Sequence, residues 1–513
     1  MMAKRIGTLR LKALPLAAAV TMASMIAAPA LAAKRDNSLR VASYQQADII
    51  DPYFNTSLVT TILAHQIWDT LVYRDPKTGE FKGALAASWT RLDDRTIEFK
   101  LRQGVKFHDG TAFEADDVVA MLNFVAKPEN KVIRRAETGW IDHAEKVDSD
   151  TVRLITKQPF PPVFELLATN IFIYPHAYYA KAGPVGMSEN PVGTGPFRVT
   201  EHARGKFIRM ERNPDYFKDS PKSQPRVAKL ELRFIPDQQT QLAEVLAGGL
   251  DLTWDVPPEQ AAPARAMPNL KVVPGETERI AFLHINGGDS TPAPPLRDVR
   301  VRQAIMYAID REAMLKSLVG EGGRLLHTMC HPVMFGCTDA GAPRYAYDPA
   351  KAKQLLAEAG YPNGFELEFY AYRDRAQTEA MITYLRAVGI RANLRFMQPA
   401  AAREARRAGK VAMDHWTWGT GIHDVYATDA VFFGGNPDDM NRDSEVRDLL
   451  ARGDTSLDPD IRKAAYAKAL ALIEERAYAL PLFALPISFI ANKDLEFMVY
   501  PDEIPRFWEM SWK

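Results

Sequence analysis

The alternation of strands and helices in the middle of the chain most strongly limits the folds open to this sequence. Extended patterns at Leu230–Phe234 and Leu252–Trp254 flank a helical pattern at Gln238–Leu246, and further extended runs follow at Leu270–Val273 and Arg279–Asn286. Strand and helix in this order are typical of α/β proteins, in which helices pack on the faces of a sheet. We therefore expect an α/β fold.

A second α/β half follows a short break. Residues 287–295 are rich in glycine, proline, serine and threonine, a composition typical of a linker between lobes. Beyond them, Val301, Ala304 and Ile305 lie on one face of an expected helix, and Phe365–Tyr370 has the pattern of a strand. At 513 residues the chain is also too long for one ordinary core. Two lobes are therefore expected.

The first 32 residues have the features of a secretory signal peptide. Four basic residues precede an apolar run from Ala13 to Ile26, and Ala30-Leu31-Ala32 has the form of a cleavage site. The run is interrupted and shorter than the roughly 20 apolar residues of a membrane anchor. We expect cleavage after Ala32 and release across the inner membrane into the periplasm.

Charge and motifs exclude several classes of function. Removal of the leader takes four of the 64 basic side chains and none of the 64 acidic ones, which leaves a net charge of −4. That charge argues against nucleic acid or an anionic membrane as a partner. The sequence contains no P-loop, no H-E-x-x-H zinc motif and no G-x-S-x-G nucleophile motif. We expect no catalytic residues, no cofactor and no enzymatic activity.

The two cysteines, Cys330 and Cys337, have six residues between them. In an exported protein this arrangement favours a local disulfide. His327 and His331 lie beside them, so a metal site and free thiols are the alternatives, although zinc sites usually place two to four residues between paired cysteines.

Two stretches that follow expected strands have side chains suited to a ligand. The stretch from Trp416 to Asp424 combines aromatic rings with bare backbone, which makes a good wall for a solute; tryptophans buried at a strand end are the alternative. Asn55 and Thr56 lie between a strand and a helix, where α/β proteins bind ligands, although turn chemistry also explains them.

Six motifs in order along the chain resemble a known family. The chain is similar to the extracytoplasmic solute-binding proteins of ABC transporters, family 5, whose members take peptides, nickel chelates and opines. The matching segments are Leu101–Gly110, Ala115–Val119, Gly193–Phe197, Asn213–Phe217, Asp298–Ala304 and Tyr347–Ala352. They extend across both expected lobes.

The resemblance implies a type II periplasmic binding protein fold with two α/β lobes. Its hinge of two crossing strands is expected at Ile280–Asn286 and Pro481–Ala491. We expect lobe I at 33–285 with an extra subdomain at 80–190, lobe II at 286–480, and a return to lobe I at 481–513. Such proteins close around a solute and present it to a membrane permease. We expect a monomer.

The resemblance also implies ligand contacts in the tryptophan stretch. Peptide-binding relatives resemble W-x-G-D here and pair the acid with the ammonium group of the peptide, whereas this chain has Thr420 after Trp418-Gly419. Asp424, four residues further along the chain, is the candidate to replace this acid. Nickel-chelate relatives use a nearby histidine, for which His415 and His423 are available. The expected contacts in this stretch are Trp416, Trp418, Gly419, Thr420, Gly421 and Asp424.

An arginine after the preceding lobe II strand holds the ligand carboxylate in dipeptide-binding relatives. Arg373 and Arg375 occupy that region, and a guanidinium suits a carboxylate through two parallel hydrogen bonds. A solvated arginine paired with Asp374 is the alternative. The sequence thus favours a periplasmic component of an ABC importer that captures a small peptide or a peptide-like amino-acid conjugate. A metal-chelate or opine binder is the second interpretation. An exported hydrolase, a chaperone and a receptor are the alternatives from other classes of function.

Overall fold

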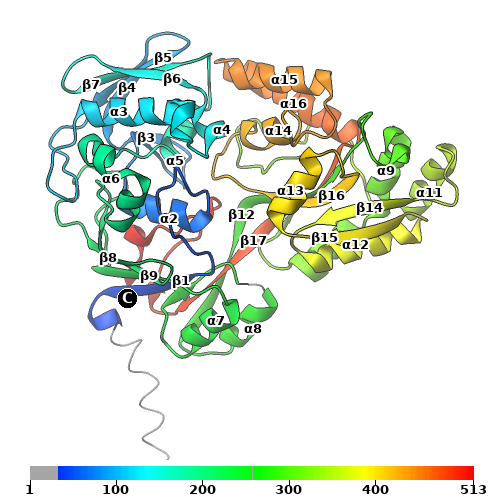
Figure 1. Cartoon of the computed structure of the whole chain (residues 1–513). Coiled ribbons are helices and arrows are strands. Elements are labelled where there is room, and N and C mark those ends of the chain that lie inside the picture. The colour runs from blue at the N-terminus through cyan, green and yellow to red at the C-terminus, as the bar shows by residue number, and fades with distance from the viewer. Residues whose placement is uncertain (1–32, 257) are drawn as a thin grey trace, which may run out of the picture.

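The computed structural model describes residues 33–256 and 258–513. The expected signal peptide and its cleavage site after Ala32 lie outside the described residues. Two lobes are joined by two long strands, β12 and β17, that pass between them (Figure 1). One sheet of 11 strands extends through both lobes in the order β15-β14-β16-β12-β17-β11-β1-β10-β9-β8, with β13 paired to β17. The predicted α/β class is confirmed.

Lobe I is built on the half of this sheet that contains β1. In β1, Leu39 and Val41 are fully buried in the lobe I core, in the alternation expected of a strand. β1 pairs in parallel with β10 and β11. The strands are β1 (Ser38–Ser43), β8 (Phe197–Ala203), β9 (Phe207–Arg212), β10 (Lys229–Phe234) and β11 (Leu252–Thr253), and the helices are α2 (Leu58–Ile67), α7 (Gln238–Leu246) and α8 (Pro258–Arg265).

A four-stranded antiparallel sheet in the order β4-β5-β7-β6 forms a further layer of the first lobe, with α3 beside it (Figure 1). Asp117 and Glu114 form a capping box at the start of α3, which explains why the helix begins where acids precede an apolar run. The elements are β2 (Val72–Arg74), β3 (Phe81–Gly83), β4 (Ala86–Arg91), β5 (Thr96–Leu101), β6 (Ile141–Lys146), β7 (Thr151–Thr156), α3 (Ala115–Ala126), α4 (Arg135–Thr138), α5 (Val163–Thr169) and α6 (His176–Glu189).

Lobe II is built on β14, β15 and β16, where β14 pairs in parallel with both neighbours. Aspartates cap its helices: Asp298 accepts from Arg300 N at the start of α9, and Asp348 accepts from Lys351 N at the start of α11. The strands are β13 (Arg324–Leu325), β14 (Glu366–Ala371), β15 (Arg391–Phe396) and β16 (Met413–Trp418), and the helices are α9 (Val299–Ala308), α10 (Arg311–Met314), α11 (Pro349–Glu358), α12 (Arg375–Ala387), α13 (Pro399–Arg407), α14 (Tyr426–Phe432), α15 (Ser444–Thr455) and α16 (Pro459–Glu475).

The two crossing strands are β12 (Leu270–Ile285) and β17 (Ala479–Asn492). The sequence suggested two separate runs, Leu270–Val273 and Arg279–Asn286, whereas the structure has one continuous strand because both parts pair with β17. The register shifts between Glu276 and Ile280, so the strand bends there. Val273 packs against the lobe I core, while Ala281 belongs to the lobe II core.

The C-terminal tail packs on lobe I. Phe507 and Trp508 are buried in the lobe I core, and Trp512 Nε1 donates to Ser38 O at 2.9 Å. Within the described residues, no helix combines the length and the apolar character needed to cross a bilayer.

Candidate functional site

The C-terminal ends of four strands face the junction of the two lobes. β1 and β11 run parallel in lobe I, and β14 and β16 run parallel in lobe II. Tyr44, Asp255, Arg373 and Gly419 follow these strands at or just beyond their ends. In α/β sheets, ligands bind outside the carboxyl ends of the strands. This edge is therefore the candidate site.

A cavity of about 430 Å³ lies at this edge and takes its walls from both lobes. Asp255 and Val256 come from lobe I, and Arg373 with the start of α12 comes from lobe II. Residues 317–319 and the crossing strand β17, with Leu485 and Pro486, complete the walls. A volume of roughly 300–1,000 Å³ is typical of small-molecule sites, so this cavity has room for a peptide-sized solute.

Arg373 and Arg375 both line this cavity. Arg373 Nε donates to Asp374 at 2.9 Å, and 37% of its side chain stays exposed. Burial lowers the pKa of Arg373, but Asp374, Tyr372 and Asp255 together outweigh burial, so the pKa is raised and the guanidinium keeps its charge. Arg375 is 60% exposed and pairs with Glu379 at 2.8 Å. Arg373 is thus the more enclosed of the two cations.

Asp255 faces these arginines from lobe I, with Tyr44 beside it. Burial raises the pKa of Asp255, and Arg373 and Arg279 oppose that shift. Burial, followed by the nearby Asp255, raises the pKa of Tyr44 to about 12. The cavity therefore carries charges of both signs on opposite lobes.

Arg279 connects the crossing strand to the C-terminal tail. Its Nε and Nη2 donate to the two carboxylate oxygens of Glu503 at 2.8 and 3.0 Å. Gly419 packs on the backbone of Arg279, since a Cβ at this glycine would lie 3.2 Å from Arg279 Cα. A side chain at position 419 would push β16 away from β12, so glycine permits this close approach.

The loop from Thr420 to His423 contacts both the hinge and lobe I. Glu278 of β12 accepts from the backbone of Thr420 at 3.2 Å and also from Gly421 N. His423 Nε2 lies 3.1 Å from Glu278 Oε2, and His423 N donates to Glu165 of α5 at 3.4 Å. Burial lowers the pKa of His423, but Glu278 outweighs burial and raises it. This loop therefore joins lobe II to lobe I through charged contacts.

The other side chains of the tryptophan stretch are used inside lobe II. Trp416 is only 5% exposed and packs on the Tyr372 ring at 4.4 Å and under the Arg406 guanidinium. Trp418 Nε1 donates to Ala427 O at 2.8 Å, so its polar edge is satisfied within the lobe. These contacts match the alternative of tryptophans packed at a strand end, and the ligand roles of both rings stay predictions.

Asp424 and His415 are also buried in lobe II. Asp424 forms a 2.7 Å ion pair with Arg462, so its charge is neutralised away from the cavity. His415 shares a 2.8 Å hydrogen bond with Thr378, and burial lowers the pKa of His415 to about 4. We therefore assign both residues to the stability of lobe II.

Asn55 and Thr56 do not line the cavity between the lobes. Asn55 Nδ2 donates to Ile49 O at 2.8 Å, and Asn55 Oδ1 accepts from Ser57 N at 2.9 Å. Thr56 is exposed. These contacts are those of a turn before α2.

Cys330 and Cys337 form a disulfide. The loop that they close places Phe335 against the stretch after the tryptophans, because Phe335 N donates to His423 O at 2.8 Å. His331 Nε2 lies 2.8 Å from Glu276 at the bend of β12.

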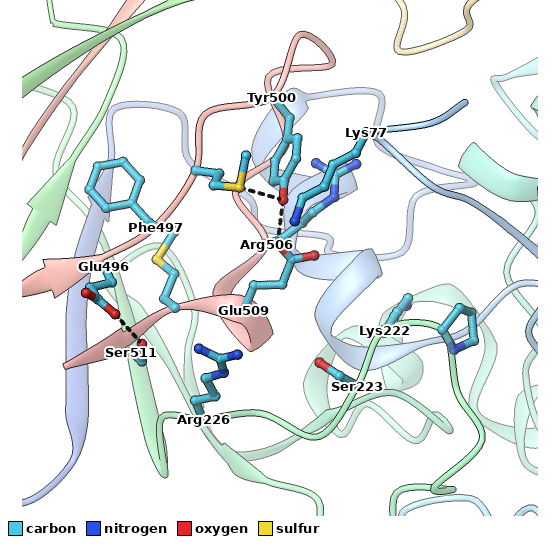
Figure 2. A pocket seen from close by; sticks show the side chains of 13 residues that line it. Lys77, Lys222, Ser223, Arg226, Glu496, Phe497, Tyr500, Arg506, Glu509 and Ser511 are labelled. Carbon is cyan, nitrogen blue, oxygen red and sulfur yellow. Dashed lines mark hydrogen bonds between the residues drawn. The ribbon is translucent and has the colours of Figure 1, made fainter. Parts of the chain in front are cut away.

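A second cavity of about 350 Å³ lies within lobe I, between the C-terminal tail and the loop near Lys222 (Figure 2). Its charged side chains are largely paired inside the lobe: Arg506 with Asp502 at 2.6 Å and Glu509 with the Tyr500 hydroxyl at 2.6 Å. The cavity between the lobes is therefore the stronger candidate for solute binding.

The sequence did not single out Asp255, Tyr44, Arg279 or Glu278. Tyr44 lies just past the end of β1. The rule that ligands bind beyond the carboxyl ends of strands, which the sequence analysis used for Asn55 and Thr56, applies to Tyr44 and Asp255 as well. Glu278 carries no local signal because its partners come from the distant segment 420–423.

Comparisons with known proteins identify the family. The family described as bacterial extracellular solute-binding proteins, family 5 Middle, matches residues 80–439. A glutathione-binding protein, GsiB from Salmonella paratyphi A, is 30% identical over 508 residues, which cover 94% of this chain and 96% of that protein.

Two solved structures are similar over 93% of the chain. A dipeptide-binding protein from Pseudoalteromonas sp. SM9913 in complex with Met-Leu has a TM-score of 0.78 at 23% identity and is covered in full. AgaA from A. tumefaciens R10 in complex with agropinic acid has a TM-score of 0.76 at 25% identity, and 99% of it is covered. The predicted type II fold and the predicted family are confirmed. The chain belongs to family 5 of the bacterial extracellular solute-binding proteins.

Proposed function

We propose that this protein captures a small peptide, or a peptide-like amino-acid conjugate, between its two lobes and delivers it to the membrane permease of an ABC importer. The observation that carries the proposal is the cavity of about 430 Å³ at the lobe junction, with Arg373 on one lobe and Asp255 on the other. Opposite charges on facing walls suit a zwitterionic solute. The protein performs no chemistry on it.

Arg373 is the proposed anchor for the solute carboxylate. It lines the cavity, stays charged and leaves part of its guanidinium exposed beside Asp374. A planar guanidinium binds a carboxylate through parallel hydrogen bonds, and such charged bonds are among the strongest in proteins. Arg375 lies in the same wall but is more exposed, so we assign it a smaller role at the mouth of the cavity.

The proposed hinge is the bend in β12 between Glu276 and Ile280, with the facing part of β17. Strand segments on either side of the bend belong to different cores, so bending there moves one lobe relative to the other. The contacts of the loop 420–423 with Glu278, which lies within the bend, and with Glu165 of lobe I join the two lobes beside the hinge. Closure around a solute would bury both of its charged ends.

The chemistry of the solute is proposed from the relatives and the cavity together. Relatives bind glutathione and the dipeptide Met-Leu. Both compounds carry a free ammonium group and at least one carboxylate, which complement Asp255 and Arg373. Glutathione, a tripeptide conjugate, is therefore the first solute to test.

An opine is the second candidate. AgaA, a structural relative, binds agropinic acid. Thr420 stands where peptide-binding relatives carry an acid, and the nearby Asp424 is paired with Arg462. A carboxylate-rich solute without a free amine fits Arg373 and Arg375 equally well.

We also propose that residues 1–32 direct export and are cleaved after Ala32, so that the mature protein acts in the periplasm. The basic start, the apolar run and the A-x-A site support this step. Mass spectrometry of the protein recovered from the periplasm tests the cleavage site directly.

Binding is tested by thermal melting and intrinsic fluorescence with glutathione, Met-Leu and an opine. A ligand that binds the folded state raises the melting temperature, and about a hundredfold excess over Kd adds about 2.7 kcal/mol to the free energy of unfolding. We expect a rise with glutathione or Met-Leu. If none of the three changes either signal, the proposal fails.

A further inference from the structure

Asp255 occupies an unusual position at the lobe junction. It follows the two-residue strand β11, lines the cavity between the lobes and has a left-handed backbone conformation with φ of +59°. This region is uncommon for residues other than glycine, although aspartate adopts it more readily than most. Strained residues of this kind persist where the surrounding structure holds them for a purpose, often at ligand sites.

The carboxylate of Asp255 lacks a direct ionic partner. In the described part of the chain, no lysine, arginine or histidine nitrogen forms a salt bridge with it within 4.0 Å. The two nearby guanidinium groups are already engaged, Arg279 with Glu503 at 2.8 Å and Arg373 with Asp374 at 2.9 Å. Among the residues that the structure describes, the group that forms a side-chain hydrogen bond with it is the neutral Tyr44 hydroxyl.

Three other carboxylates near the junction, in the described part of the chain, have partners. Glu503 accepts from Arg279, Asp374 accepts from Arg373, and Glu278 accepts from the backbone of the loop 420–421. A carboxylate taken from water without a cation is costly, so a cationic partner placed beside Asp255 would be strongly favoured. The unfilled space next to it is the cavity itself.

We infer that Asp255 binds the ammonium group of the solute and so determines specificity for ligands with a free amine. The inference rests on the proposed function and deepens it. Since Asp255 belongs to lobe I and Arg373 to lobe II, one zwitterionic solute would touch both lobes, its ammonium on the first and its carboxylate on the second. Tyr44 would hold the carboxylate of Asp255 in place through its hydroxyl group.

The alternative role for Asp255 is to form a salt bridge with Arg373 when the lobes close, without contacting the solute. In that case, removal of the Asp255 charge would weaken every solute alike. The two roles are separated by comparing ligands that differ only in the charge of the amine.

The test is calorimetric titration of glutathione and Met-Leu, and of the same compounds acetylated on the free amine, into wild type and Asp255→Asn. Asp215→Asn, which removes an exposed lobe I charge away from the cavity, is the matched control. We expect wild type to prefer the free amine roughly ten- to hundredfold, and Asp255→Asn to lose that preference while it keeps the acetylated ligand within about threefold.

Equal weakening of free and acetylated ligands in Asp255→Asn would overturn the inference and leave the proposed function intact. Wild type that binds acetylated and free ligands equally would overturn it without any variant, even if Asp255→Asn does not fold. Wild type that binds none of these compounds would contradict the proposed function and the inference together. A change of the same size in Asp215→Asn would also overturn it, because the effect would then come from the charge of the lobe.

Discussion

Arg373 is the residue on which carboxylate recognition depends in the proposed cleft. Arg373→Ala removes a charged, hydrogen-bonding group from the cavity wall, and such bonds contribute about 1.5–3 kcal/mol. We expect affinity for glutathione or Met-Leu to fall roughly ten- to hundredfold by calorimetry. Arg375→Ala is the matched comparison, with a much smaller loss, because that side chain is mostly exposed and paired with Glu379. Unchanged affinity in Arg373→Ala would remove the residue from the site.

His423 gives the lobe contacts a dependence on pH. It lies between Glu278 and Glu165, with Arg74 behind Glu165, and the net effect of these groups is a raised pKa. A raised pKa in the folded state means that the stabilising contribution is complete below the unfolded value of about 6.5 and is lost as the pH rises through the folded value.

We therefore expect the melting temperature of wild type to fall as the pH is raised above about 6.5, and His423→Gln to reduce this slope. The variant should match wild type most closely at the alkaline end. Asp454, whose pKa burial raises to about 7, adds a slope of the same sign in both proteins, so the difference between them isolates His423. Identical slopes would show that His423 does not carry a stabilising charge.

Residue patterns in the sequence located only part of the candidate site. Arg373 was found through the resemblance to dipeptide-binding relatives. Asp255 was missed although the extended pattern Leu252–Trp254 was predicted, because no motif of that resemblance covers this segment. Trp416 and Trp418 are two residues apart on one strand, so both rings point to the same face and pack against α13 and α14. Asp424 looked available because its partner, Arg462, is 38 residues away and leaves no local signal.

At the scale of elements, strands and helices were largely predictable and their continuity was not. The helix Gln238–Leu246 was predicted with the bounds it has, because its pattern and its Asp237 cap are local. β12 was predicted as two runs because Pro274-Gly275 resembles a break. Pairing with β17 on both sides of that dipeptide keeps the strand continuous, and pairing partners hundreds of residues away are not visible in a single sequence.

The disulfide loop from Cys330 to Cys337 supports the segment that follows the tryptophans. Since closing a loop of this length restricts the unfolded chain, the double variant Cys330→Ser/Cys337→Ser should lose about 2–3 kcal/mol of unfolding free energy. Thermal melting measures the loss. Dithiothreitol should lower the melting temperature of wild type and leave that of the double variant unchanged. A double variant as stable as wild type would contradict a stabilising role.

At the scale of the whole molecule, the bend in β12 separates two cores that share one sheet. The cavity walls come from both cores and from β17, so a solute in the cavity contacts every part that moves when the strand bends. Binding and closure are therefore expected to be one event. A solute that satisfies only one lobe would bind without bringing the other lobe closer.

Small-angle X-ray scattering of the mature protein, with and without a saturating solute that calorimetry shows to bind, tests this claim most directly. Arg373→Ala at the same solute concentration is the control. We predict a smaller radius of gyration in wild type with glutathione or Met-Leu, and a smaller change in Arg373→Ala, in proportion to its lower occupancy. Full occupancy of wild type with an unchanged radius of gyration would contradict capture between closing lobes.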